Sequence, residues 1–425
     1  MKSVVRIAGK GKVQDVELQA VEVHPGVLDA EPLVELIQAC IPLAARAARE
    51  LIEGEVTALA GRKYCRQGRQ PGHVRWTQQR GSISLLDQQV PLTYTRVRNR
   101  LRNAEVPLTT YHGLQTPRAR DAGLFRRVLL GLSCRNYQAC AEAVPEAFGL
   151  SASTVSRRFI RASARQLQAL QERRLEGYDF VALVLDGKTC AADEVVIALG
   201  ITLTGEKVLL GFVQTATENE RVCAAFLREL IERGLKTDQG LLCVIDGAKG
   251  LRKALQTVFG PQAVVQRCQW HKRENVLDYL APAQRPAWRR KLQAAYERPT
   301  YPAARAALLR VRQELKAVNE SAVKSLDEGF EETLTLHRLG VFPQLGVSFK
   351  TTNCLESINA QVARRLGRVT AWRTADQKHR WVAAALLDIE PRLRRIKGYR
   401  ALPLLRVALQ AEIREQETAK GTQAA

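Results

Sequence analysis

The stretch Phe180-Val181-Ala182-Leu183-Val184-Leu185-Asp186-Gly187 decides the fold of this chain of 425 residues. Its unbroken apolar run predicts a buried strand, and the Asp-Gly pair is turn chemistry that ends it. A second stretch, Leu241-Leu242-Cys243-Val244-Ile245-Asp246-Gly247, repeats this pattern. Apolar strands that end in this way place a carboxylate at the edge of a sheet, where open α/β sheets bind ligands. Two such carboxylates can hold a hard divalent cation, although Asp-Gly is also an ordinary turn.

The flanking sequence continues the pattern of an α/β core. Further β-rich runs are expected at 195–203, 208–213 and 263–267, and turn residues at 204–207 join the first two as a hairpin. Helical periodicity is expected at 221–233 and 250–259. The resulting order, three strands and then alternating helices and strands, predicts an α/β fold. Residues 271–340 and 354–390 are expected to be helical.

The composition indicates a polyanionic partner. The chain has 65 Lys and Arg against 43 Asp and Glu, a formal charge of +22. Residues 51–180 carry 21 basic and 10 acidic side chains, whereas residues 181–250 carry 7 and 10. The acidic island therefore contains both Asp-Gly strands, between basic flanks. The nine scattered cysteines are typical of reduced thiols, and no signal peptide, membrane span or phosphate-binding loop is expected.

The basic amino-terminal region contains a candidate helix-turn-helix. We expect a first helix at 136–144 after an amphipathic stretch that breaks at Pro42 and a small strand pair at 72–98. A turn at 148–150 and a second helix at 151–160 complete the motif. Early residues of that second helix would face the major groove of DNA: Thr154, Ser156, Arg157 and Arg158. The alternative is a plain helical hairpin with solvated arginines.

A third carboxylate comes from Thr351-Thr352-Asn353-Cys354-Leu355-Glu356-Ser357-Ile358-Asn359. Thr352 or Asn353 would cap a helix, with Glu356 in its first turn near the positive end of the helix dipole. The spacing of Asn353 and Glu356 also fits a capping box, which would make Glu356 structural.

Four motifs together resemble the mutator-type transposases of bacterial insertion sequences, which have a ribonuclease H-like DDE core. They are the segments 185–187, 244–250, 266–272 and 351–359. The resemblance implies the catalytic triad and metal ligands Asp186, Asp246 and Glu356, with Mg²⁺ as cofactor and Mn²⁺ as its substitute. It also brings in Cys268 and His271, a C-x-x-H signature that we expect to support the active site together with Asn353. Trp270 is expected in the core rather than stacked on a base.

The expected fold is therefore α/β, with a ribonuclease H-like core whose mixed five-stranded sheet is flanked by helices. A helical insertion domain and a mainly helical amino-terminal DNA-binding region complete it. The expected boundaries are 1–120 for the amino-terminal region, 121–178 for the helix-turn-helix, 179–280 and 349–400 for the core, 281–348 for the insertion, and 401–425 for a tail. After the Glu356 helix, Arg364, Arg365 and Arg368 would contact phosphate or form a solvated face.

The expected function is that of a DNA transposase that binds the terminal inverted repeats of its element, cleaves DNA strands and transfers the freed 3′-hydroxyl to DNA. Its partners would be double-stranded DNA, at element ends and target, and further copies of the chain in a homodimer or larger assembly. It would act in the bacterial cytoplasm at the nucleoid, with no membrane association. Two alternatives remain: a catalytically inactive, repurposed DNA-binding protein, and a related nuclease without strand transfer.

Overall fold

The computed structural model describes residues 30–64, 70–85, 87–115, 118–141, 147–190, 193–215, 219–369 and 371–424. Two compact units are present. The amino-terminal unit contains residues 1–124 and 134–155, and the second unit contains residues 125–133 and 156–425. The expected strand regions of the catalytic core all fall in the second unit.

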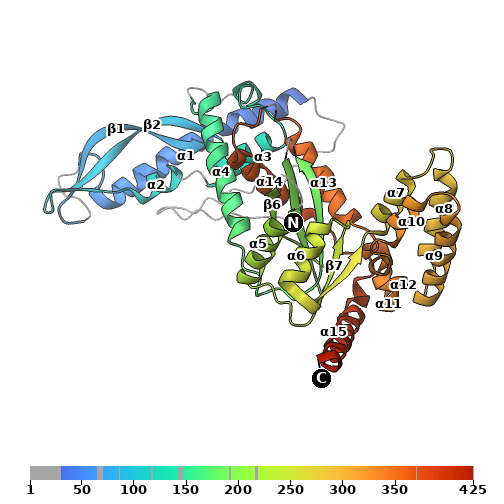
Figure 1. The fold of residues 1–425 in the computed structure, drawn as a ribbon. Coiled ribbons are helices and arrows are strands. Elements are labelled where there is room, and N and C mark those ends of the chain that lie inside the picture. The colour runs from blue at the N-terminus through green and yellow to red at the C-terminus, as the bar shows by residue number, and fades with distance from the viewer. Residues whose placement is uncertain are drawn as a thin grey trace. The chain divides into compact units, whose positions relative to one another are not determined.

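A mixed five-stranded sheet forms the centre of the second unit (Figure 1). Its spatial order is β6-β5-β4-β7-β8, with β4 antiparallel to β5, β5 antiparallel to β6, and β4, β7 and β8 mutually parallel. The strands are β4 (Phe180–Cys190), β5 (Asp193–Thr202), β6 (Lys207–Thr215), β7 (Leu241–Ile245) and β8 (Ala263–Arg267). This is the predicted mixed sheet, and it is consistent with a ribonuclease H-like core.

Alternation along the strands builds two apolar layers. On β4, Val184 packs with one layer, which includes Leu355 and Ile358 of α13. Its neighbours Leu183 and Leu185 pack with the other. The second layer is closed by two helices that follow β6 and β7, α5 (Glu220–Glu232) and α6 (Lys249–Phe259). The face of β4 that carries Val184 therefore also carries Asp186, two residues on.

The other sheet face is covered by helices from late in the chain. These are α12 (Phe342–Phe349), α13 (Asn353–Leu366), α14 (Ala375–Ile389) and α15 (Leu402–Ala424). Short 3-10 helices at Glu390–Arg392 and Tyr399–Ala401 lie between the last two, and one at Gly260–Gln262 precedes β8. The expected tail at 401–425 is thus largely a helix whose Leu402, Leu405 and Leu409 are core residues.

Helices between β8 and α12 have an apolar core of their own, made of residues such as Trp288, Leu308 and Leu326. They are α7 (Gln269–Asp278), α8 (Arg285–Tyr296), α9 (Tyr301–Lys316), α10 (Glu320–Asp327) and α11 (Thr335–Arg338), with a 3-10 helix at Glu331–Leu334. This layer lies within residues 271–340, which were expected to be helical. It begins within α7, because Val276 and Leu277 already pack in it.

The amino-terminal unit packs one long helix on a small sheet. Helix α1 (Ala30–Ala60) places Ile52 and Val56 against β1 (His73–Leu85), β2 (Gln88–Asn99) and β3 (Ala104–Val106). The sheet order is β1-β2-β3, and α2 (Thr109–Gln115) follows. The strand pair was predicted, but the helix break at Pro42 was wrong: α1 is continuous through that residue.

The predicted helix-turn-helix is wrong in its first half. In place of a helix at 136–144, the structure has one 3-10 turn at Gln138–Cys140 and extended backbone at Ala141; residues 142–146 lie outside the described part. The hydroxyl of buried Tyr137 donates to Asp87, and Phe148 exchanges two backbone hydrogen bonds with Gln89. These contacts with the strand pair replace the expected helix and turn. Helix α3 (Arg118–Leu129) comes earlier, and α4 (Ala152–Gln171) contains the expected second helix.

None of the helices in the described ranges is both long and apolar enough to span a lipid bilayer.

Candidate active site

The two Asp-Gly stretches meet at one edge of the five-stranded sheet. Strands β4 and β7 pair in parallel, with Leu185 opposite Ile245, so that the next residues, Asp186 and Asp246, lie next to each other. Strand β7 ends before Asp246, as expected. The expected end of β4 at Asp186-Gly187 is wrong, because β4 continues to Cys190 by pairing with β5. Asp186 is buried, with 5% of its surface exposed, and Asp246 is half-buried. The Asp246 carboxylate accepts a hydrogen bond from the backbone N–H of Ala248 (3.0 Å), which fixes the turn into α6.

Helix α13 brings the third carboxylate to this edge. The side-chain amide of Asn359 donates to the Asp186 carboxylate at 3.1 Å. Glu356 precedes Asn359 by three residues and therefore lies on the same face of the helix. It accepts a hydrogen bond from the Thr352 hydroxyl (3.1 Å). Because Thr352 is the N-cap, Glu356 occupies the fourth helical position rather than the third, and the alternative capping box with Asn353 does not form.

Cys268 and His271 lie beside the same carboxylates. The backbone N–H of Cys268 donates to Ile245, the residue before Asp246, at 2.7 Å. Its buried sulfur caps α7 by accepting from the His271 N–H, and the Thr352 hydroxyl also contacts it, at 3.8 Å. Through these contacts Cys268 joins the end of β7, the first turn of α7 and the N-cap of α13.

The His271 ring faces the acidic cluster. Its Nε2 lies 3.9 Å from Glu356 Oε1. Burial lowers the pKa of His271, but its contact with the Cys268 sulfur and the charges of Cys268, Asp186 and Asp246 outweigh burial and raise it to about 9. The ring is therefore protonated at neutral pH and offsets part of the negative charge.

Arg267, at the end of β8, holds the loop after Asp246. Its guanidinium donates to the carbonyl of Gly247 (2.8 Å) and to that of Glu328 in the helical insertion (2.9 Å). Gly247 has φ +113°, and a Cβ there would lie 2.0 Å from Arg267 Nε. Only a glycine accommodates both this backbone conformation and this contact. The loop that positions Asp246 is thus tied to the helical insertion.

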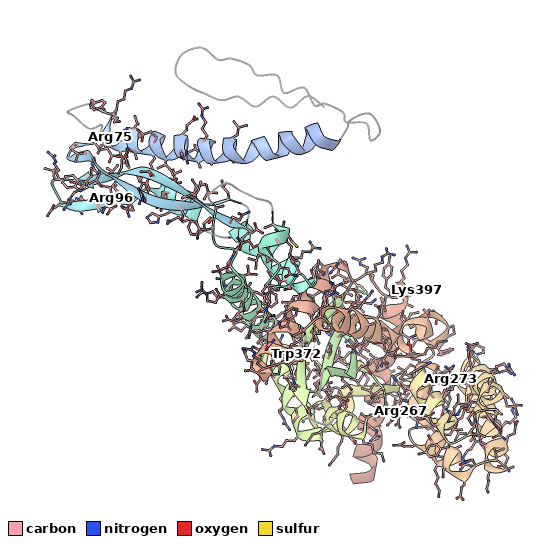
Figure 2. The ribbon with its side chains drawn as sticks, turned by 90° about the horizontal axis from the view of Figure 1, so that it is seen from above. Arg75, Arg96, Arg267, Arg273, Trp372 and Lys397 are labelled. Atoms are coloured by element: carbon pink, nitrogen blue, oxygen red, sulfur yellow. The ribbon has the colours of Figure 1, made fainter. Side chains whose placement is uncertain are left out.

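Asn353 lies apart from the carboxylate contacts. It is exposed, and it lines a cavity of about 180 Å³ together with Trp270, Arg273 and Lys350. Figure 2 labels Arg273 and Arg267 in this part of the chain. Trp270 is 42% exposed, so the expectation that it belongs to the core is wrong. Asn359 was not predicted to be a site residue. Its position one turn after Glu356 places both residues on one face of the helix and could have indicated it.

The basic residues proposed for DNA contact differ in exposure. On the first turns of α4, Arg157 is exposed, whereas Thr154, Ser156 and Arg158 are half-buried. Arg364 and Arg368, at the end of α13, are exposed. Arg365 differs from the expected phosphate contact because it is buried and pairs with Asp388 at 2.7 Å. Its charge is used within the fold.

Known proteins are similar to this chain in sequence. The family described as "Transposase, Mutator family" matches residues 116–393. The chain is 26% identical over 309 residues to the transposase for insertion sequence element IS256 in transposon Tn4001 of Staphylococcus aureus, covering 65% of this chain and 76% of that one. It is 30% identical over 233 residues to the transposase for element IST2 of Acidithiobacillus ferrooxidans, covering 52% and 76%. A match over more than half of the sequence establishes the relationship: the chain belongs to the Mutator family of transposases.

Proposed function

We propose that this transposase binds the terminal inverted repeats of its element, cleaves DNA strands by metal-dependent phosphodiester hydrolysis, and transfers the freed 3′-hydroxyl to DNA. The observation that carries the proposal is the juxtaposition of Asp186 and Asp246, each directly after the last residue pair of the parallel strands β4 and β7, with Asn359 of the Glu356 helix bonded to Asp186. These three carboxylates would form a DDE triad on the ribonuclease H-like core.

The donor set fits an oxygen-preferring divalent cation. In the described ranges, no three His, Cys, Asp or Glu side chains converge closely enough to hold a metal ion. The site nevertheless offers hard carboxylate oxygens, and Asn359 Oδ1 is buried beside Asp186 with no hydrogen-bond partner among the described residues. That oxygen can accept a hydrogen bond from a water of a hydrated Mg²⁺, an ion that keeps several waters. Asp186, Asp246 and Glu356 would hold Mg²⁺, with Mn²⁺ as a substitute.

Bound ions of this kind stabilise the charge on the attacking and leaving oxygens of an in-line displacement. The chain's own groups prepare the site for that chemistry. The Thr352 hydroxyl and the protonated His271 ring orient Glu356. Asn359 orients Asp186. Cys268 supports the turn that carries His271, so each carboxylate has a neighbour that limits its rotation.

Basic side chains would bind the DNA backbone and the repeats. The residues proposed for this role are Thr154, Ser156, Arg157 and Arg158 on α4, Arg364 on α13 and Arg368 just after it. If about eight phosphates are neutralised, the log–log dependence of affinity on salt should have a slope of about −7. A slope near zero would contradict this part of the proposal. Since an element has two ends, the active form would be a homodimer or larger assembly acting on DNA of the nucleoid.

The test compares two substitutions of the same kind at opposite ends of β7. Asp246→Asn removes a proposed metal ligand, whereas Asp238→Asn removes an exposed carboxylate that precedes the strand. The measurement is cleavage of DNA from the two flanks of the gene, with Mg²⁺ or Mn²⁺, followed by joining to target DNA. We expect wild type and Asp238→Asn to cleave and join, and Asp246→Asn to do neither.

Other outcomes select the alternatives. Equal cleavage by wild type and Asp246→Asn would show that the carboxylates are not catalytic. Specific binding without any cleavage would favour a repurposed DNA-binding protein. Cleavage without joining would favour a nuclease.

A further inference from the structure

We propose that the turn Arg100-Leu101-Arg102-Asn103, between β2 and β3, binds duplex DNA with Leu101 inserted in the minor groove. The proposal rests on the function given above, because it assigns this protein a second DNA contact outside α4 and α13. We call these four residues the β2–β3 tip.

The β2–β3 tip is held in one shape by its own side chains. Strands β2 and β3 pair up to Asn99 and Ala104, which bracket the tip. The Asn99 side chain accepts a hydrogen bond from the N–H of Arg102 (3.1 Å), and Arg98 donates to the Asn103 side chain (2.7 Å). Asn103 adopts φ +50°, a conformation that asparagine tolerates well. A tip that is already ordered loses little conformational freedom when it binds.

Two arginines of the tip carry charge that the protein does not use. Arg75 and Arg96, on the adjoining strands, pair with Glu53 and Glu105; Figure 2 labels both. Arg100 and Arg102 are exposed, and neither forms an ion pair within the described ranges. Two unpaired guanidinium groups on one short turn favour an anionic partner.

Leu101 distinguishes this partner from a simple polyanion. It stands between the two arginines and is 78% exposed. Its side chain lies over the backbone of Gly72. A Cβ at Gly72 would be 2.7 Å from Leu101 Cγ, so only a glycine leaves room for Leu101 in this position. Burying an exposed leucine contributes about 1.5–3 kcal/mol, which requires an apolar surface.

Duplex DNA supplies both features within the width of one turn. Its base pairs lie between two rows of phosphates, and a base step that opens toward the minor groove exposes the apolar faces of the bases. The minor groove attracts arginine where it is narrow, and it accepts leucine as a wedge between base steps. An acidic protein surface would satisfy the arginines, but it offers no reason for a leucine between them.

A basic and an aromatic side chain also pair on the paired strands β1 and β2. The Arg98 guanidinium stacks over the Trp76 ring, 4.9 Å from its centroid, and Trp76 is 46% exposed. Arg62 and Lys63, just after α1, are also exposed. The carbonyl of Gly61, the residue before Arg62, accepts a hydrogen bond from Arg75 of β1 (2.9 Å). Arg75 pairs with Val97, close to the end of β2 from which the tip begins. These groups would extend the contact to the phosphates that border the groove.

The experiment measures DNA binding by the full-length protein, using fluorescence anisotropy with short A·T-rich and G·C-rich duplexes over a range of salt. The test variants are Arg100→Gln/Arg102→Gln and Leu101→Ala. The matched control is Arg46→Gln/Arg49→Gln, which removes the same charge from exposed positions on α1. Unchanged melting temperatures verify that each variant is folded, as expected for exposed side chains.

We expect the double tip variant to bind about tenfold more weakly and its salt slope to shrink by about 2, because each lost phosphate contact removes about 1. Leu101→Ala should weaken binding with little change of slope. Distamycin, a minor-groove ligand, should compete with the wild type, whereas methyl green, a major-groove ligand, should not.

The outcomes separate this proposal from the proposed function. A wild-type protein that binds no duplex would overturn both. Strong wild-type binding that the tip variant and the control reduce equally would overturn the β2–β3 tip alone. Competition by methyl green and not by distamycin would also overturn it. So would a double tip variant that no longer binds an acidic protein such as casein but binds DNA as the wild type does.

Discussion

Asn359 donates a hydrogen bond of 3.1 Å to the carboxylate of Asp186, across 173 positions of sequence. The donor is on α13 and the acceptor is within β4, so this bond joins the helix of Glu356 to the strand of Asp186. Both residues are buried. A hydrogen bond to a buried charge is stronger than one between neutral groups, which makes Asn359 a positioning residue for the proposed triad.

Removing this bond should reduce cleavage without unfolding the protein. We expect Asn359→Ala to lower the rate about tenfold to a hundredfold, because a hydrogen bond to a charged group contributes about 1.5–3 kcal/mol. The matched control is Asn353→Ala, which removes the same side chain from an exposed position on the same helix. The measurement is the rate of end cleavage together with the melting temperature. Equal rates for the two variants would show that Asn359 does not position Asp186.

Gly247 should be far less replaceable than a glycine of similar backbone conformation elsewhere. Both Gly247 and Gly340 have positive φ, but a Cβ at Gly340 meets nothing within 4 Å, whereas one at Gly247 meets Arg267. We expect Gly340→Ala to cost about 1–2 kcal/mol from its backbone alone. Gly247→Ala should cost more and should also lower cleavage, because the loop carries Asp246. Urea midpoints measure the first effect, and equal midpoints would contradict the role given to Arg267.

Two adjacent arginines on α13 should separate stability from DNA binding. Arg365 is buried against Asp388, which also pairs with Arg392, so Arg365→Ala should lower the free energy of unfolding by about 1.5–3 kcal/mol, the usual contribution of hydrogen bonds to a charged group. Arg364 is exposed, so Arg364→Ala should leave stability unchanged and weaken DNA binding. Denaturant unfolding and a salt titration of binding measure the two quantities. The reverse pattern would restore Arg365 to the DNA-contact set.

Lys272 should make stability rise with pH in an alkaline window. Burial, and then the charge of Arg267, lower the pKa of Lys272 from 10.5 to about 8. Between these values the unfolded chain binds a proton that the folded protein lacks, so raising the pH favours folding. Between about pH 8 and 10.5, the free energy of unfolding of the wild type should rise by up to about 3 kcal/mol relative to that of Lys272→Met. This follows from about 1.36 kcal/mol for each unit by which the pKa is lowered. Urea unfolding measures the difference, and a flat one would contradict the lowered pKa.

Local patterns were sufficient to predict the sheet. The limits of β7 and β8 agree with the expected runs, because strands buried on both faces read as uninterrupted apolar segments bounded by turn residues. The Asp-Gly pair after β7 ends that strand as expected, whereas β4 continues through its Asp-Gly pair because β5 pairs with it as far as Cys190. Tertiary contacts overrode local signals in the amino-terminal unit. The hydroxyl contact of Tyr137 with Asp87 and the bridge between Phe148 and Gln89 replaced a helix that the sequence favoured.

The sequence by itself determined the order of strands and helices along the chain, the two aspartates that follow apolar strand runs and the glutamate at a helix start, because each depends on residues that are neighbours in the chain. Only the tertiary structure decided which polar side chains serve those carboxylates. Asn359 contacts Asp186 and Asn353 does not, and Arg365 is buried while Arg364 is exposed. Neighbouring or identical residues receive different roles because a helix turns about 100° per residue, and the sheet covers only one of its faces.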